Sequence, residues 1–252
     1  MLEFCGVSSG YGRREVLHSL SACFEKGRMT CVIGPNGCGK STLLKTAAGL
    51  LPVRAGTVTV DGAALCRMTP VQSARRIAYL AQEHAAPDMT AGELVLHGRF
   101  AHLRYPRRYG RRDREIARAA MERLGIGELA GRPMRELSGG MRQLCYIAMA
   151  LAQEADYILL DEPTSSLDIA NRLQLMDVLR ALAADGHGIV AVLHDLTLAM
   201  EYADTVTVLC DGRLLVSGTP EDVCASGAVR EAFGVGLRRS EDASGGAYYV
   251  VR

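Results

Sequence analysis

The feature that most constrains this chain is a glycine-rich turn, Gly34-Pro-Asn-Gly-Cys-Gly-Lys-Ser41, between an apolar run and a helix-forming run. It fits the pattern G-x-x-x-x-G-K-[ST]; the run at residues 29–33 predicts a buried strand, and the run at residues 42–48 predicts a helix. Glycines let backbone N–H groups converge on phosphate oxygens, and the start of a helix adds partial positive charge. This order of strand, loop and helix predicts a phosphate-binding loop in an α/β fold.

Lys40 and Ser41 complete the motif with chemistry that glycine cannot supply. The lysine reaches the β and γ phosphates as a point charge, and the serine hydroxyl is a ligand for Mg²⁺. The chain has only three lysines, and one of them falls at the required place. The alternative is an ordinary glycine-rich βα turn, although a chance match in a chain of this length is expected only about a few times in a thousand.

Two carboxylates, Asp161 and Glu162, end a second apolar run that starts at Tyr157. At the end of a strand, Asp161 can take Mg²⁺ through water, and Glu162 can polarise an attacking water as a general base. Alone, such a pair more often faces solvent and caps a helix. Beside a phosphate-binding loop, the catalytic interpretation is favoured.

Apolar runs that alternate with helical patterns predict a mainly parallel sheet covered on both faces. The expected strands are residues 29–33, 57–60, 77–80, 156–160, 188–193 and 205–210, and the longest expected helices are residues 113–124, 139–153 and 168–184. From residue 88 to about 154 no strand pattern occurs, which predicts a helical subdomain inserted into an α/β core. We expect one domain over residues 1–236 and a tail over 237–252, with a flexible polar middle and a last strand at 248–251.

The composition is that of an ordinary globular protein, with 252 residues, 48% of them hydrophobic and 23% charged. The net charge of +1 is not the footprint of a nucleic-acid binder, so no nucleic-acid partner is expected. No apolar run approaches the length of a spanning helix, and no secretory signal is visible, so we expect a cytosolic protein. The eight cysteines contain no C-x-x-C pair, which argues against a zinc site or a redox motif.

Leu137-Ser-Gly-Gly140 opens a predicted helix, where a serine before two glycines is in itself ordinary capping chemistry. Together with the phosphate-binding loop and Leu159-Leu-Asp-Glu-Pro-Thr164, it resembles the ATPase subunit of ATP-binding cassette (ABC) transporters. The resemblance covers about residues 2–234. It implies a P-loop NTPase core, an N-terminal antiparallel β subdomain and an inserted α-helical subdomain. In that family the LSGG segment binds the γ-phosphate of ATP held by the partner subunit.

Four other positions match the family's motifs in the expected order. Tyr11 matches the aromatic that stacks on adenine, Gln82 the glutamine that senses Mg²⁺ and the permease, Asp168 the D-loop and His194 the switch histidine. Alone, each such residue is more often structural. The resemblance implies catalytic roles for Glu162, His194 and Lys40, and Mg²⁺ contacts from Ser41, Gln82 and Asp161. The ATP-binding residues that it implies are Tyr11, Gly34, Pro35, Asn36, Gly37, Cys38, Gly39, Lys40, Ser41, Thr42, Ser138, Gly139, Gly140 and Asp168.

Two departures from the family pattern bear on the rate of turnover. Met141 takes the fifth position of the signature, usually Gln or Glu, and Met149 stands where many relatives have Arg. Because methionine is a poor hydrogen-bonding partner, we expect slower ATP turnover than in relatives. Cys38 lies beside Lys40 near a helix start, where thiol pKa values fall, so we expect thiol reagents to inhibit hydrolysis and ATP to protect.

Segments such as 93–99, 168–174, 193–199 and 211–220 resemble the importers of iron-siderophore complexes, haem and vitamin B12. The resemblance implies a head-to-tail homodimer with two sandwiched ATP molecules, integral membrane permease subunits, and indirect work with a substrate-binding protein. It also places the subunit at the cytoplasmic face of the inner or plasma membrane.

Two alternatives to an importer subunit are a soluble ATP-dependent switch acting on a ribosome or DNA, and a module that binds nucleotide without hydrolysis. For the basic run between residues 99 and 114, one interpretation is a surface that faces lipid headgroups or acidic permease loops. The favoured interpretation is a solvated loop and helix face.

Overall fold

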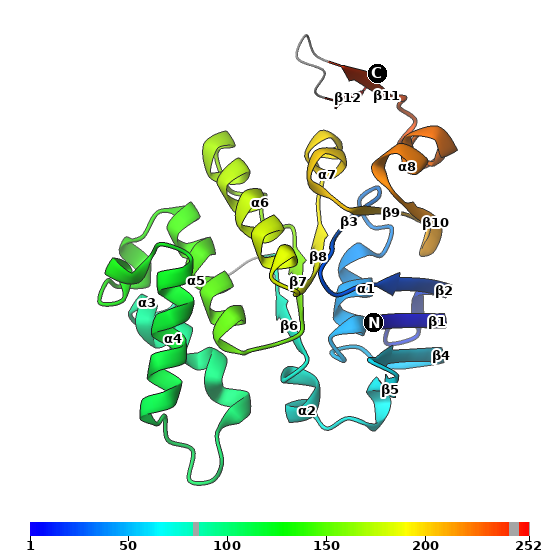
Figure 1. Cartoon of the computed structure of the whole chain (residues 1–252). Helices are drawn as coiled ribbons and strands as arrows, with labels where there is room; N and C mark the ends of the chain where they lie inside the picture. The colour runs from blue at the N-terminus through cyan, green and yellow to red at the C-terminus, as the bar shows by residue number, and fades with distance from the viewer. Residues whose placement is uncertain (83–85, 242–246, 252) are drawn as a thin grey trace.

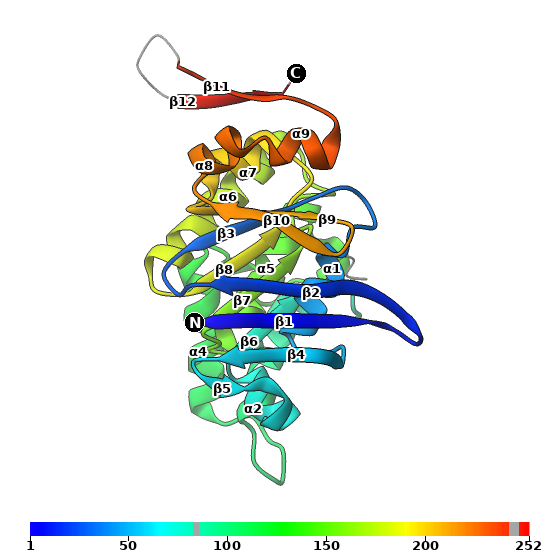
Figure 2. The same cartoon turned by 90° about the vertical axis from the view of Figure 1, so that its right-hand side faces the viewer.

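The computed structural model describes residues 1–82, 86–241 and 247–251, and its N-terminal part is an antiparallel sheet (Figures 1 and 2). The strands lie in the order β2-β1-β4-β5. Their bounds are β1 Leu2–Tyr11, β2 Arg14–Phe24, β4 Val53–Val60 and β5 Ala63–Ala64. Patterning alone had indicated only part of β4, residues 57–60, because bulges in β1 and β2 interrupt the two-residue alternation. The antiparallel subdomain implied by the family resemblance is confirmed.

The second sheet has six strands in the order β10-β9-β3-β8-β7-β6, and only β10 runs antiparallel to its neighbour. The bounds are β3 Met29–Ile33, β6 Ile77–Leu80, β7 Tyr157–Asp161, β8 Gly188–Val192, β9 Thr205–Cys210 and β10 Arg213–Gly218. The predicted α/β class with a mainly parallel sheet is therefore confirmed. Three strands match their expected bounds, whereas β7 starts and ends one residue later than expected and β8 ends one residue earlier.

Helices cover both faces of this sheet and form the connections between its strands (Figure 1). The bounds are α1 Lys40–Ala47, α2 Pro70–Ala74, α3 Ala91–His97, α4 Arg111–Arg123, α5 Gly139–Ala152, α6 Ile169–Ala184, α7 Leu196–Tyr202, α8 Pro220–Ser226 and α9 Ala228–Phe233. Short 3₁₀ helices lie at Leu65–Arg67, Gly98–His102, Gly127–Leu129 and Met134–Glu136. In the described residues, no helix combines the length and the apolar character that spanning a bilayer requires.

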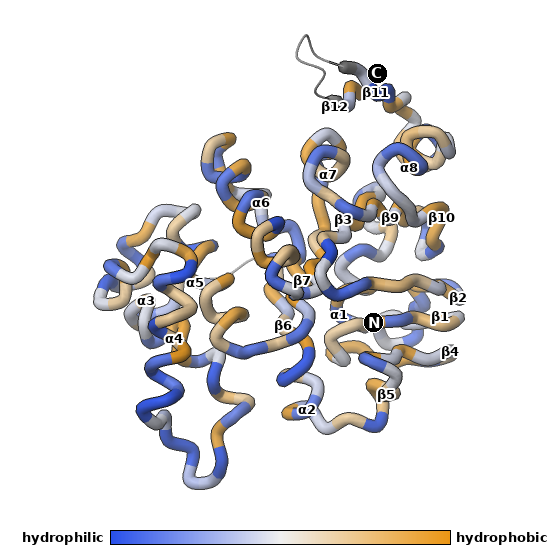
Figure 3. Tube along the Cα trace, in the orientation of Figure 1, coloured by the Kyte–Doolittle hydropathy of each residue, from blue (hydrophilic) through white to orange (hydrophobic). Residues whose placement is uncertain are grey.

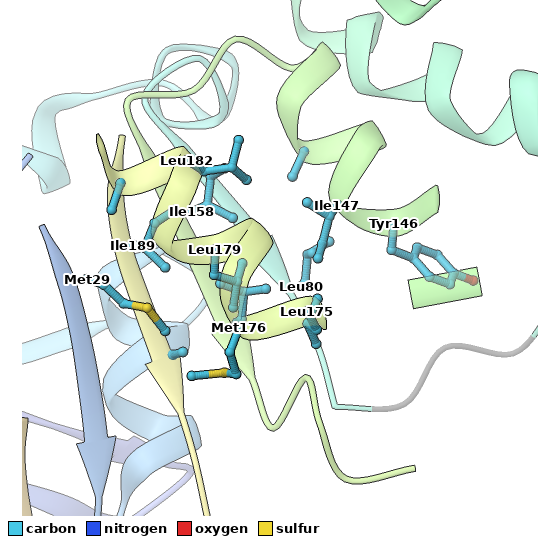
Figure 4. Close-up of a cluster of buried hydrophobic side chains, with 14 of the residues drawn as sticks. Met29, Leu80, Tyr146, Ile147, Ile158, Leu175, Met176, Leu179, Leu182 and Ile189 are labelled. Atoms are coloured by element: carbon cyan, nitrogen blue, oxygen red, sulfur yellow. The ribbon is translucent and has the colours of Figure 1, made fainter. Parts of the chain in front are cut away.

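The two faces of the parallel sheet belong to two separate cores, because successive side chains of a strand point to opposite sides. Val32 and Val192 pack with α1 and the antiparallel sheet. On the other face, Ile158 and Ile189 pack against buried residues of α6, and this cluster continues into α5 (Figure 4). The phosphate-binding loop at the end of β3 is thus placed on a strand that is buried on both sides.

Between residues 88 and 154 the chain forms α3, α4 and α5 and no strand, apart from an isolated bridge between Thr90 and Pro133. The three helices contribute to one continuous apolar cluster with the sheet. The inserted α-helical subdomain is therefore confirmed.

A hairpin of β11 (Leu237–Glu241) and β12 (Ala247–Val251) follows α9 and lies beside α7 and α8 (Figure 2). The strand expected at residues 248–251 is β12. Tyr249 is buried, and its hydroxyl donates to Oε1 of Glu221 at 3.1 Å. The flexible middle that we expected for the tail falls on residues 242–246, which lie outside the described residues.

Candidate nucleotide-binding site

The glycine-rich loop runs from the end of β3 to the start of α1, and its conformation requires glycine at two positions. Gly39 caps α1 with φ 108°, in the left-handed region where a side chain would be strained. A Cβ on Gly34 would lie 2.2 Å from the carbonyl oxygen of Leu209 on the neighbouring strand β9. The loop is therefore held tightly against the sheet, and its N–H groups are gathered at a helix N-terminus, as anion binding requires.

Lys40 is the first residue of α1, and its side chain is 6% exposed. Its ammonium donates to the carbonyl oxygens of Gly34 at 2.7 Å and Pro35 at 2.9 Å. An ammonium has three N–H donors, so these contacts aim the charge into the loop while one donor remains for a phosphate oxygen.

Cys38 corrects one expectation from the sequence. Its side chain is buried, and burial raises the pKa of the thiol, although Lys40 lowers it in part. The depressed pKa that we expected from the helix start is therefore wrong, because desolvation outweighs the nearby positive charge. The Cys38 thiol is not an activated nucleophile in this conformation.

Ser41 and Asp161 meet across the gap between α1 and the end of β7. The serine Oγ donates to Asp161 Oδ1 at 2.9 Å, and the hydroxyl of Tyr79 donates to Oδ2 at 3.2 Å. Burial raises the pKa of Asp161 above its usual range, and Glu162 raises it further, against the lowering effect of the two hydrogen bonds. A serine hydroxyl and a carboxylate are the hard oxygen donors that Mg²⁺ prefers, so this pair fits the ion.

Glu162 follows β7 in a left-handed backbone conformation, with φ 54°. Gln82 Nε2 donates to Glu162 Oε2 at 2.5 Å, and His194 Nε2 lies 2.5 Å from Oε1. Two residues that are far apart in the sequence therefore converge on one carboxylate. A strained backbone at a residue held by two polar partners is characteristic of functional sites. Gln82, for which the family resemblance implies a contact with Mg²⁺, contacts this glutamate.

A pocket of about 380 Å³ brings Gly39, Lys40, Ser41 and Glu162 together, whereas Asp161, Gln82 and His194 do not line it. Its lining joins the hairpin of the antiparallel sheet to the phosphate-binding loop and Glu162: Tyr11, Arg14, Val16, Asn36, Gly37, Gly39, Lys40, Ser41, Thr42 and Glu162. Tyr11 is 45% exposed, and Lys45 Nζ lies 5.9 Å from the centre of its ring. The pocket thus has a phosphate-binding floor and an aromatic ring at its rim, as a nucleotide requires.

Ser138, Gly139 and Gly140 lie apart from this pocket, at the start of α5 in the helical subdomain. The Ser138 hydroxyl accepts a hydrogen bond from the N–H of Met141 at 3.3 Å, which is ordinary N-capping. A Cβ on Gly140 would lie 2.7 Å from Oδ1 of Asn171 in α6. Asn171 in turn donates to Asp168, the N-cap of α6. The signature and the D-loop therefore form one packed unit, in which Asp168 is a helix cap.

Sequence reasoning missed four residues of this arrangement. Arg14 and Val16 line the pocket, Tyr79 holds Asp161, and Asn171 packs against Gly140. The signal for Tyr79 in the sequence is its polar hydroxyl within the apolar run of β6, the strand next to β7. Nothing local in the sequence marks Asn171, because its contact depends on how α5 and α6 pack.

Comparisons with known proteins show what this chain is similar to. Residues 17–165 match the family model described as ABC transporter. The chain is 38% identical to the ferric enterobactin transport ATP-binding protein FepC of Escherichia coli (strain K12), over 97% of this chain and 91% of that protein. It is 37% identical to the probable siderophore transport system ATP-binding protein YusV of Bacillus subtilis (strain 168), over 94% and 86% respectively.

Solved structures give the same picture. A metal-chelate type ABC transporter in an inward-facing conformation superposes with a TM-score of 0.86 at 27% identity, covering 100% of this chain and 97% of that one. An ATP-binding cassette of an ABC transporter in its ADP conformation superposes with a TM-score of 0.83 at 25% identity, covering 92% and 98%.

Proposed function

We propose, from the premise that this chain belongs to the ABC transporter family, that it is the ATP-hydrolysing subunit of an import system for an iron-siderophore, haem or cobalamin-type substrate. The single observation that carries the hydrolytic part is Glu162, which Gln82 and His194 hold from both sides beside the phosphate-binding loop. The names of the relatives support the import part, since they include siderophore, hemin and cobalamin import proteins.

In this proposal Glu162 takes a proton from the water that attacks the γ-phosphate in line. Lys40 stabilises charge on the phosphate oxygens, and His194 contacts the γ-phosphate. Ser41 and Asp161 would hold Mg²⁺, which supplies charge neutralisation when it is bound, and Gln82 holds Glu162 through its side-chain amide. Tyr11 supports the adenine from the rim of the pocket.

The chain works as a head-to-tail homodimer in this proposal. Ser138, Gly139 and Gly140 lie outside the pocket of their own chain, and Ser138 and Met141 are exposed at a helix N-terminus. The start of α5 therefore serves the γ-phosphate of an ATP bound to the partner, while Asp168 holds α6 against it. Each of the two ATP molecules is sandwiched between the loop of one copy and the signature of the other.

The dimer acts at the cytoplasmic face of the inner or plasma membrane, where integral permease subunits recruit it. Closure around ATP is transmitted to a cytoplasmic helix of the permease that docks near Gln82, and a substrate-binding protein delivers the cargo on the other side.

The test is Mg²⁺-dependent ATP hydrolysis by the wild type and by Glu162→Gln, with the oligomeric state in saturating ATP measured by light scattering. We expect the variant to lose about 100-fold or more of its activity, as for removal of a general base, and to accumulate as an ATP-bound dimer. Glu128→Gln, an exposed glutamate in the helical subdomain, is the matched control and retains activity.

Full activity of Glu162→Gln would exclude this residue as the base. Hydrolysis without any ATP-dependent dimer would contradict the sandwich. Membrane recruitment by a co-expressed permease then separates the importer from a soluble ATP-dependent switch, which would remain in the soluble fraction.

A further inference from the structure

A segment of the helical subdomain carries an unusual concentration of positive charge. Between Glu93 and Asp113 the sequence contains no acidic residue and six arginines. One of them, Arg99, is buried, which corrects the expectation of a uniformly solvated basic run. We call residues 103–112 the arginine loop, since its five arginines are all exposed: Arg104, Arg107, Arg108, Arg111 and Arg112.

The base of the arginine loop is firmly attached to the domain. Arg99 donates to the carbonyl oxygen of Ala152 at 2.7 Å and to Glu154 at 2.6 Å, and it lies 3.3 Å from Asp113. Nε2 of His102 lies 2.9 Å from the carbonyl oxygen of Gln153. The buried arginine therefore fixes the segment before the loop to the end of α5, and the exposed arginines project from a rigid base.

Most charges of the loop are not neutralised by the described residues of the domain. Arg111 pairs with Glu115 at 2.7 Å, and Arg107 stacks on the ring of Phe100 at 4.6 Å. Among the residues that the structure describes, Arg104, Arg108 and Arg112 have no acidic partner within ion-pair distance. Unpaired cations on a fixed surface attract an external anionic surface over about one Debye length.

An aromatic side chain stands among these arginines. Tyr105 is 96% exposed, and Phe100 is 51% exposed at the foot of the loop. Figures 1 and 2 show the loop between Gly98–His102 and α4 at the lower end of the molecule, opposite the C-terminus, and Figure 3 shows the adjoining start of α4 as hydrophilic. Aromatic rings among cationic side chains are the composition of surfaces that lie at the headgroup level of a bilayer.

From this combination we infer that the arginine loop docks the subunit on anionic lipid headgroups. The arginines bind phosphate groups, and Tyr105 enters the interface between headgroups and acyl chains. The inference rests on the charge and exposure of the loop and does not depend on the hydrolytic role of Glu162, so failure of one leaves the other in place.

The experiment is co-sedimentation of the purified full chain, without nucleotide, with vesicles of phosphatidylglycerol and phosphatidylcholine in equal parts. Vesicles of phosphatidylcholine alone are the lipid control. Each exposed arginine near the surface contributes about fivefold to binding, so the variant R104Q/R107Q/R108Q is expected to bind on the order of 100-fold more weakly. We expect Tyr105→Ser to weaken binding by about threefold, because it leaves the charges in place.

The matched control is R13Q/R213Q/R238Q, which removes three exposed arginines from other faces and leaves the arginine loop intact. It is expected to bind the anionic vesicles within about twofold of the wild type. Equal loss in both triple variants would mean that net charge alone drives binding, and would overturn the docking surface. Unchanged binding by the loop variant would do the same, as would binding of the wild type only to membranes that contain the permease, which would identify an acidic permease segment as the partner. Circular dichroism of both variants verifies that they fold.

Discussion

The phosphate-binding loop and the signature segment at the start of α5 are built in different ways. Around the phosphate-binding loop, Lys40, Ser41 and Asp161 are bound to their own chain, and Glu162 is held by two partners. At the start of α5, Ser138 only caps its own helix, and Met141 is 40% exposed. One end is organised before any partner arrives. The other presents a helix N-terminus to the outside, which is the arrangement expected of a site completed by a second surface.

The two segments also differ in how their side chains affect the stability of the fold. Asp161 is buried with a raised pKa, so the folded chain binds its proton more tightly than the unfolded chain. Its contribution to stability is therefore greatest at low pH and declines as the pH rises from the usual Asp range through the raised value. At neutral pH the carboxylate costs folding free energy, a cost that the exposed signature does not carry.

The largest expected effect comes from removing that charge. Asp161→Asn keeps one oxygen acceptor for Ser41 or Tyr79, its amide N–H can donate to the other hydroxyl, and the negative charge is lost, so Mg²⁺-dependent hydrolysis should fall by a factor on the order of 100. The same change should stabilise the fold at pH 7 by about 0.5–2 kcal/mol, measured by urea denaturation. A less stable variant would show that Asp161 is a structural residue whose burial is fully compensated.

The next effect tests the signature end. Gly140→Ala places a Cβ against Oδ1 of Asn171, so the start of α5 and the cap of α6 must separate. We expect ATP-dependent dimerisation and hydrolysis to fall by about 10-fold, whereas binding of a fluorescent ATP analogue to the monomer stays unchanged. Adding Asn171→Ala should restore part of the activity. Weakened binding to the monomer would instead show that the two ends are coupled within one chain.

The smallest expected effect concerns Met141. If this exposed position makes a polar contact across the dimer in relatives, Met141→Gln should raise the turnover number by about two- to fivefold, the worth of one modest hydrogen bond. Steady-state kinetics at saturating ATP measures the turnover number. Met149→Arg, at a partly buried position of the same helix, serves as a comparison. An unchanged rate for Met141→Gln would rule out slow turnover caused by this residue.

Most of the fold was predictable because its signals are local. The runs that became β3, β6 and β9 are short, apolar and bounded by turn residues, so their ends are marked in the sequence. The strands β1 and β2 were not predicted, since their bulges shift the alternation of side chains. The arginine run shows the same limit, because charge density in the sequence did not separate buried Arg99 from its exposed neighbours.

The sequence by itself determined the phosphate-binding loop, the two carboxylates at the end of β7 and the family, because these depend on residue types at fixed spacing along one segment. Only the tertiary structure decided that Gln82 and His194 converge on Glu162 and that Asn171 packs against Gly140. It also decided that the pKa of Cys38 is raised by burial and not lowered by the helix start. Those outcomes depend on distances between segments and on the exclusion of water, and neither is a property of neighbouring residues in the chain.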